Sequence, residues 1–263
     1  MNIATIELFE IKIHKMNLFK RLKYKRLANK YKAKENPNEI QFVIENTKLN
    51  QTVFDIGAHK GAYSYFLNKG IGSNGQLHIF EPQSYYYEYL LMIKRIFNWK
   101  NTTINKIALS NDTGKATLNI PLYRGKVDSQ SATLLTHKDR NLFQTEEVNL
   151  DTIDNYCLRN SLIPNLIKID VEGNELNVLL GGINTINKYK PIILIEIESR
   201  HVGLEKANNT FKFFKDAGYN GYFFFENKKH SIEEFSFDTH QSDVTKFSLN
   251  RYSNNFIFTI ESY

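Results

Sequence analysis

The chain has 263 residues, 41% of them hydrophobic, which is enough to bury one sizeable core in a single large domain. Cys157 is the only cysteine, so an intramolecular disulfide is excluded, and we expect this side chain to be a small buried apolar group rather than a nucleophile. The net charge is +6, and no run approaches the roughly 20 apolar residues that a membrane span needs. Glu7 and Glu10 interrupt the stretch where the apolar part of a signal peptide would lie, so a cytoplasmic enzyme is expected.

The positive charge is concentrated in one N-terminal segment. Residues 11–34 hold ten of the 34 Lys and Arg and no acid, which leaves 24 basic against 28 acidic residues elsewhere. This distribution argues against a general nucleic-acid-binding face. Leu18 and Leu22 lie at helical spacing and predict a basic amphipathic helical extension over residues 1–36, before a break at Pro37. This helix is expected either to pack on the main domain, residues 37–263, or to contact an anionic membrane peripherally.

From Thr52 onward, short apolar runs alternate with helix-like segments. The expected parallel strands cover 52–58, 76–82, 102–110, 165–171 and 192–198. The helices between and after them cover about 63–69, 85–97, 175–189 and 204–217. This alternation predicts an α/β, Rossmann-like fold with a mostly parallel sheet that helices cover on both faces.

Two features depart from the βα alternation. Residues 115–122 and 145–153 alternate like hairpin strands, which predicts a β-hairpin insertion over about 111–150. This insertion is the candidate acceptor wall, with hydroxyls from Ser129–Leu135, and an ordinary surface hairpin is the alternative. The closing strands, within 219–226 and 254–261, are expected to have no helix between them, so one strand near the edge of the sheet is expected to be antiparallel.

The strongest local motif is the turn that follows the first strand. It reads Asp55-Ile-Gly57-Ala58-His59-Lys-Gly61 and precedes a helix. Glycines at such a turn let the backbone approach a ligand, and the helix N-terminus offers free N–H groups to a carboxylate or a phosphate. A tight turn without a ligand remains the alternative at this point.

An acid at the end of the second strand indicates which kind of ligand the turn binds. Glu81 follows Gly61 by twenty residues, and a carboxylate there can accept hydrogen bonds from both ribose hydroxyls of a nucleoside. An NAD-binding turn prefers a glycine where this chain has His59. Asp55 suits a cofactor with an ammonium group, so the pattern favours S-adenosylmethionine.

More acids follow the fourth and fifth strands, at the edge where ligands bind in open α/β sheets. Asp170 and Glu172 are expected to orient or deprotonate an acceptor, or to hold the cofactor. His201 is the candidate general base, ahead of His240. Glu175 reads as a helix cap, while Glu196 and Glu198 lie at the same rim. Asp170 with Glu196 is able to offer oxygen ligands to Mg²⁺, but the sequence shows no dense carboxylate cluster, and no metal site is assigned.

An ordered set of runs resembles the FkbM-family methyltransferases. The runs are VFDIGAHKGAYS, HIFEP, NKIALSNDTG, LDTID, IKIDVEGNELNVLLGG and PIILIEIE, over roughly residues 50–200. The resemblance implies a class I methyltransferase fold and methyl transfer from S-adenosylmethionine to oxygen, often on sugars, glycolipids or polyketide-like products.

The resemblance also implies roles for individual residues. Asp55, Gly57 and Gly61 match the cofactor turn and Glu81 the ribose acid. Ala108 matches the segment near the adenine, and Asp170 and Glu172 match the acids after the fourth strand. The family usually carries Asn where this chain has His59, which changes the contact at the methionine end.

Three hypotheses follow for the function. The first is an O-methyltransferase that acts on a hydroxyl of a small-molecule, sugar, glycan or glycolipid-like acceptor, in which positioning supplies much of the rate. The second is an RNA-binding methylase or binding module that docks through residues 11–34. The third is a nicotinamide-dependent oxidoreductase, which His59 and the lack of a recognisable proton relay disfavour.

Overall fold

The computed structural model describes residues 3–123, 126–127, 132–135, 143–245 and 251–260. Its central sheet has eight strands in the order β11-β10-β12-β9-β8-β1-β2-β3. The strands are β1 (Thr52–Ile56), β2 (Gln76–Phe80), β3 (Thr102–Asn105), β8 (Leu166–Ile169), β9 (Ile192–Glu196), β10 (Asn220–Phe225), β11 (Lys228–Ser231) and β12 (Asn255–Thr259).

The sheet is mostly parallel, as the sequence predicts. β3, β2, β1, β8 and β9 run in one direction, and β12 lies antiparallel between β9 and β10. This confirms the expected antiparallel strand near the edge. The short β11 forms a hairpin with β10 and adds a second antiparallel strand, which the sequence pattern does not predict.

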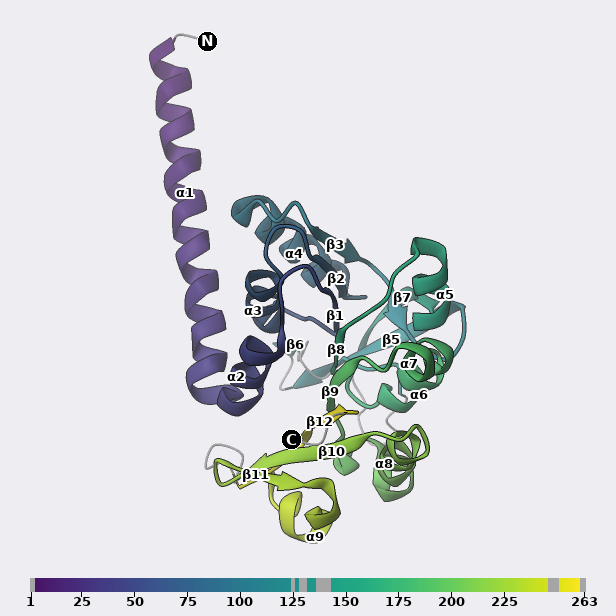
Figure 1. Cartoon of the computed structure of the whole chain (residues 1–263). Helices are drawn as coiled ribbons and strands as arrows, with labels where there is room; N and C mark the ends of the chain where they lie inside the picture. The colour runs from purple at the N-terminus through teal and green to yellow at the C-terminus, as the bar shows by residue number, and fades with distance from the viewer. Residues whose placement is uncertain (1–2, 124–125, 128–131, 136–142, 246–250, 261–263) are drawn as a thin grey trace.

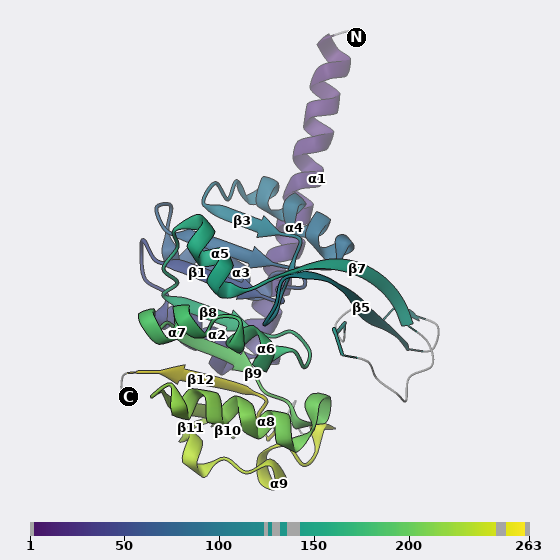
Figure 2. The ribbon, with the colours of Figure 1, turned by 90° about the vertical axis from the view of Figure 1, so that its right-hand side faces the viewer.

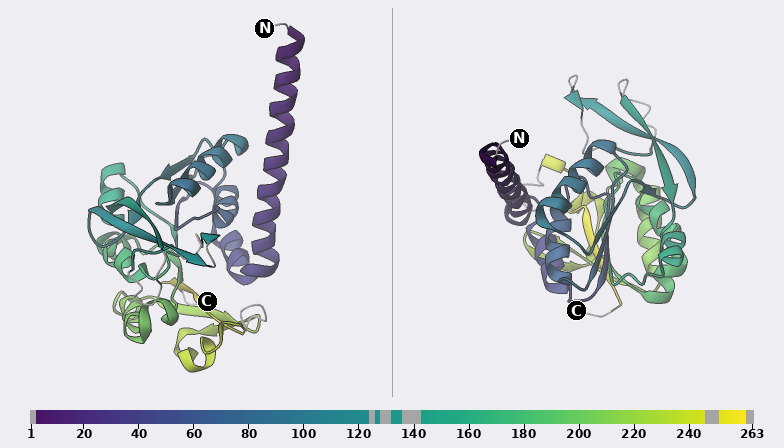
Figure 3. Two further views of the ribbon diagram at one scale, coloured as in Figure 1. Left: turned by 180° about the vertical axis from the view of Figure 1, so that it is seen from behind. Right: turned by 90° about the horizontal axis from the view of Figure 1, so that it is seen from above.

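Helices cover both faces of the sheet, which makes three layers (Figures 1 and 3). One face packs against α2 (Pro37–Asn46), α3 (Ala62–Ile71) and α4 (Ser84–Phe97). The other packs against α5 (Ile153–Asn160), α6 (Glu175–Leu180), α7 (Ile183–Tyr189) and α8 (Ser199–Asp216). Within β1, Val53 faces the first layer and Phe54 the second, because successive side chains of a strand point to opposite faces. This explains the continuous apolar runs of the central strands.

Two predicted elements are divided in the structure. The helix expected over 175–189 is two helices, because Gly181 packs on the carbonyl oxygen of Ser110, where an added Cβ would lie 1.9 Å away. The strand expected over 102–110 ends at Asn105, and β4 (Ala108–Leu109) leaves the central sheet to pair with β7. Both changes follow from contacts between segments far apart in the sequence.

The hairpin insertion is present. β5 (Gly114–Tyr123) and β7 (Phe143–Asp151) pair antiparallel, with the short β6 (Lys126–Val127) beside β5, and Figure 2 shows them projecting from the sheet. In the expected acceptor wall, 129–131 lie outside the described residues. Thr133 pairs with Asn119, and its hydroxyl donates to the carbonyl oxygen of Glu172 at 2.6 Å. The segment around Thr133 therefore joins the hairpin to the loop after β8.

The N-terminal extension forms the long helix α1 (Ile3–Lys30), followed by the π-helical turn η1 (Tyr31–Glu35). The chain leaves the helical conformation at Asn36, and Pro37 opens α2, so the break lies where the sequence predicts it. Tyr24 and Ala28 are buried against the domain, while the N-terminal part of α1 extends beyond it (Figure 1). Within the described part of the chain, no helix combines the length and apolar character needed to cross a membrane.

The expectation of no helix between the closing strands is wrong, because two short helical turns separate them. These are the 3₁₀ turn η3 (Ile232–Glu234) and the one-turn helix α9 (Phe237–His240). His240 is buried among Phe223, Phe225 and Phe235, so the structure places it in the core and not at the rim.

Candidate functional site

A cavity of about 230 Å³ opens at the carboxyl ends of β1, β2, β8 and β9. It is the region where ligands bind in open α/β sheets. Seven of the ten residues proposed from the sequence line it: Gly57, Ala58, His59, Glu81, Ala108, Asp170 and Glu172. Asp55, Gly61 and His201 do not line the cavity but adjoin residues that do, as described below.

Gly57 sets the shape of the turn after β1. Its φ is +72°, and a Cβ there would lie 1.7 Å from the carbonyl oxygen of Asp170. Only glycine therefore lets this turn pack against the loop after β8. His59 also has a left-handed backbone, with φ +49°, and its ring lies 4.1 Å from that of Tyr86.

Glu81 joins the turn to the end of β2. Its side chain is 2% exposed, and its two oxygens accept the backbone N–H groups of His59 at 2.7 Å and Gln83 at 2.9 Å. Burial raises the pKa of this carboxyl to about 7, although the two backbone hydrogen bonds oppose the change. Each oxygen keeps a further lone pair for a ligand hydroxyl.

Asp55 lies beneath the cavity floor and is fully buried. It accepts a hydrogen bond from Oγ of Ser64 and lies 3.6 Å from Nζ of Lys168. Lys168 in turn donates to the carbonyl oxygen of Gly57 at 3.0 Å and lies 3.3 Å from Asp170. Asp55 therefore acts on the turn through Lys168. Burial alone would lower the pKa of this lysine, but Asp170 and Asp55 outweigh that effect and raise it.

Gly61 connects the turn to the N-terminal extension. It caps α3 with φ +74°, and its carbonyl oxygen accepts the hydroxyl of Tyr24 at 2.6 Å. A Cβ on Gly61 would lie 2.7 Å from Leu90 and 2.9 Å from the Tyr24 hydroxyl. This glycine is thus required by the packing of α1 and α4 around the turn.

Five acids gather at the rim after β8 and β9. They are Asp170, Glu172, Glu175, Glu196 and Glu198, several of which raise one another's pKa. The sequence alone shows no dense carboxylate cluster, but the fold forms one, because pairing of β8 with β9 brings two separate acidic segments together. Glu175 accepts the N–H groups of Val171 and Gly173 at 3.0 Å each, so these hydrogen bonds hold the loop before α6 and do not cap the N–H groups of the helix.

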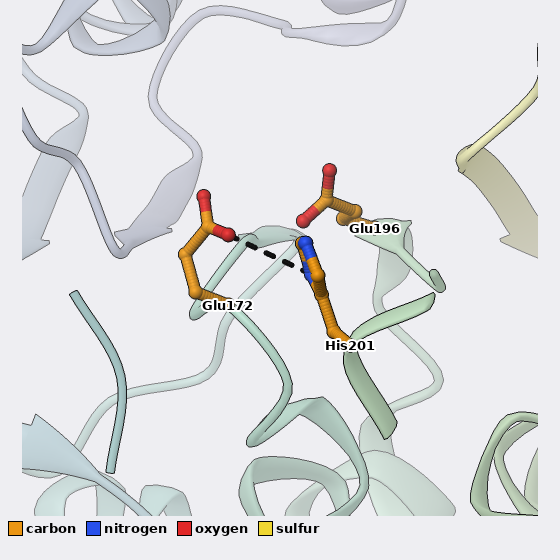
Figure 4. A group of neighbouring side chains, drawn as sticks. All are labelled: Glu172, Glu196 and His201. Atoms are coloured by element: carbon orange, nitrogen blue, oxygen red, sulfur yellow. Dashed lines mark ion pairs between the residues drawn. The ribbon is translucent and has the colours of Figure 1, made fainter. Parts of the chain in front are cut away.

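His201 meets two of these acids at the start of α8 (Figure 4). Its Nδ1 lies 3.6 Å from Oε2 of Glu172, and the two side chains are 20% and 25% exposed. Burial and the charge of Asp170 raise the pKa of Glu172 to about 9. Because Nδ1 and Oε2 lie 3.6 Å apart, the imidazole of His201 and the carboxyl of Glu172 are close enough to exchange a proton or to share a ligand.

Several lining residues were not found from the sequence. Tyr31, Glu35 and Asn36 come from the N-terminal extension, and Asn254 comes from the loop before β12. Tyr63 is 7% exposed, and its hydroxyl has no hydrogen-bond partner among the described residues. Lys168 was available as a sequence clue, since a lysine inside an apolar strand needs a buried partner. The others carry no local pattern that points to this cavity.

Comparisons with known proteins agree with this architecture. A family model, Methyltransferase FkbM domain, matches residues 55–220. The crystal structure of methyltransferase FkbM from Methylobacillus flagellatus KT superimposes with a TM-score of 0.50 and 16% identity, over 80% of this chain. This chain spans only 43% of that protein's length.

A second solved structure is matched by this chain over a larger share of its own length than the first. The cofactor-bound Rv0187 from MTB has a TM-score of 0.50 and 11% identity, with 94% of this chain and 90% of that one covered. At these identities the likeness shows the fold alone. No curated protein matches the sequence.

Proposed function

The chain belongs to the FkbM methyltransferase family, and from this premise we propose that it transfers a methyl group from S-adenosylmethionine to a hydroxyl oxygen of a sugar, glycan or glycolipid-like acceptor. The observation that carries the proposal is Glu81, a buried acid beside the Gly57 turn, in the same cavity as the acids of the opposite rim. The side of the cavity with Glu81 and the Gly57 turn suits a nucleoside donor, and the side with the rim acids suits a polar acceptor.

The donor end of the cavity fits S-adenosylmethionine. Glu81 would accept the ribose hydroxyls, and Ala108 would lie beside the adenine. The unpaired hydroxyl of Tyr63 would donate to the carboxylate of the amino-acid tail. When bound, the donor supplies an electrophilic methyl group on a sulfonium.

The acceptor would enter between the rim acids and the hairpin. Leu118, Ala132 and Leu134 of the hairpin line the cavity opposite Glu172, and Thr133 fixes the Glu172 backbone. We propose that Asp170, Glu172 and His201 orient the acceptor hydroxyl and assist loss of its proton. Because methyl transfer needs an in-line approach of oxygen to carbon, this positioning supplies much of the rate.

Calorimetric titration of the purified protein tests the donor. S-adenosylmethionine and its demethylated product are expected to bind, and NAD is not, because the side chain of His59 occupies the place of the second dinucleotide glycine. Tight binding of NAD without a response to S-adenosylmethionine would refute the proposal. For the acceptor, glycans from cells with and without the active gene should differ by the mass of one methylene group.

We also propose that α1 contacts an anionic membrane surface. Leu18, Phe19 and Leu22 are 51%, 67% and 48% exposed, on a different face of the helix from the buried Tyr24. Basic residues surround them, and 11–34 contain no acid, which suits a negatively charged bilayer. Such a contact would bring the enzyme to the surface that a glycolipid acceptor occupies.

Vesicle flotation tests this contact. The protein should float with vesicles that contain phosphatidylserine and remain unbound with neutral ones. Replacing Leu18, Phe19 and Leu22 by Ser should abolish flotation without changing donor binding, because these side chains lie away from the cavity. Retention on RNA but not on vesicles would instead favour an RNA-docking role for the helix.

A further inference from the structure

Three side chains from different elements converge at the acidic rim (Figure 4). Glu172 lies in the loop after β8, Glu196 is the last residue of β9, and His201 lies in the first turn of α8. One ligand atom from each lies within 4.8 Å of the other two. Carboxylate oxygens and an imidazole nitrogen at this separation are able to surround a single ion.

The basic side chains nearest to these three residues make their direct contacts with other acids. Lys168 is engaged with Asp55 and Asp170, and Arg200 forms two hydrogen bonds with Glu198. Among the described residues, no Lys or Arg forms an ion pair with Glu172 or Glu196. Holding two carboxylates this close is costly unless a proton or a cation joins them.

A buried atom gives independent evidence for a missing ligand. Oε1 of Glu196 accepts a hydrogen bond from Nδ2 of Asn254 at 2.6 Å, but its Oε2 is buried and has no hydrogen-bond partner among the residues that the structure describes. A buried carboxylate oxygen without a partner is expensive. In Figure 4 the Glu196 carboxylate lies beside the His201 ring, and the Glu172 carboxylate approaches the same ring from another direction. The carboxylate that carries the unpaired oxygen is therefore one of the three groups whose ligand atoms lie within 4.8 Å of one another.

We propose that Glu172, Glu196 and His201 bind a divalent first-row transition-metal ion. Two carboxylates suit Mn²⁺, and the imidazole favours this series over Mg²⁺ or Ca²⁺, which prefer oxygen alone. This set of ligands replaces the pair Asp170 and Glu196 considered from the sequence, because Asp170 is already engaged with Lys168.

The role of the ion rests on the proposed function. Glu172 and Glu196 line the cavity, so an ion held by them faces the acceptor. The acceptor hydroxyl would bind the ion through its oxygen and release its proton to water. The oxygen then forms a bond to the methyl carbon, and the carbon–sulfur bond breaks with its electron pair left on sulfur. His201 is in this case a ligand and not the general base.

Titration with Mn²⁺, followed by the paramagnetic resonance of the free ion, tests the site in the full-length protein without any donor. After treatment with a chelator, the wild-type protein is expected to bind one Mn²⁺ per chain. Glu196→Gln and His201→Ala should each weaken binding by at least about tenfold, since even outer-shell groups contribute that much. The matched control is His230→Ala, which removes an imidazole paired with Glu234 on another part of the surface.

Two results would overturn the inference: no saturable binding of Mn²⁺ by folded wild-type protein, or equal binding by wild type and His201→Ala. Circular dichroism of each variant verifies that it is folded. Calorimetry with S-adenosylmethionine on the same samples separates this inference from the proposed function. Donor binding without Mn²⁺ binding refutes only the ion site, and Mn²⁺ binding without donor binding refutes only the donor.

Discussion

Replacing Tyr24 tests whether helix α1 is an integral part of the domain. This side chain is 1% exposed, and its ring lies 5.3 Å from Phe97 and 6.0 Å from both Tyr65 and Trp99. Its hydroxyl donates to the carbonyl oxygen of Gly61, at the cofactor turn. A helix that only locates the enzyme at a membrane would not need these contacts.

The two possible substitutions separate the hydrogen bond from the packing. Tyr24→Phe loses one buried hydrogen bond, worth about 0.5–1.5 kcal/mol of unfolding free energy, and the Gly61 oxygen keeps the N–H of Tyr65 at 3.2 Å. Tyr24→Ala also empties a ring-lined site, for which about 3–5 kcal/mol is typical. In a domain of this size each kcal/mol lowers Tm by about 2–4 °C.

Urea unfolding monitored by circular dichroism measures both changes. The matched control is Phe19→Ala, on the same helix but 67% exposed, which should alter stability by less than about 0.5 kcal/mol. If Tyr24→Ala is no less stable than Phe19→Ala, the packing of Tyr24 on the domain does not stabilise the protein. The conclusion that α1 is an integral part of the domain is then refuted.

Three further predictions concern the site and the core. Glu81→Gln should weaken S-adenosylmethionine by about 1–3 kcal/mol in calorimetry, since an amide has one acceptor oxygen where two are used. Because the ionised carboxyl is the better acceptor and its pKa is about 7, wild-type affinity should fall as the pH drops below 7, and the variant should lose this dependence. Gly57→Ala should destabilise more than Gly218→Ala in urea: both glycines have positive φ, costing about 1–3 kcal/mol, but only Gly57 has a clashing neighbour. Burial raises the pKa of the Cys157 thiol to about 12, so it should resist a thiol reagent at pH 8 until the protein is unfolded; rapid labelling of native protein would contradict this.

Much of the fold follows from local patterns in the sequence. The continuous apolar run of β9 predicts a strand buried on both faces, and the glycines after β1 predict a close turn before a helix. Glu81 was identified as a ligand-facing acid by its position at a strand end, and the structure places it on the cavity wall. These features depend on residues within one βα unit, so a linear pattern is sufficient to identify them.

The composition of the rim could not be predicted in the same way. Glu172 and Glu196 belong to different strands, and the cluster exists because β8 and β9 are neighbours in the sheet. The sequence alone therefore suggests Asp170 with Glu196 as oxygen ligands and gives no sign that Lys168 engages Asp170. The division of the 175–189 helix has the same origin, since the contact of Gly181 with Ser110 spans distant segments.

The N-terminal extension shows most clearly what local sequence patterns predict and what they do not. Its charge and helical spacing predict a basic helix, and the helical conformation is interrupted at Asn36, just before Pro37. Only the tertiary structure places Tyr31 and Asn36 on the cavity wall and joins Tyr24 to Gly61. Helix propensity, glycine turns and apolar periodicity act between near neighbours and are readable from the chain. Which side chains meet across the cavity depends on packing between segments far apart in sequence, and packing is decided only when the whole core assembles.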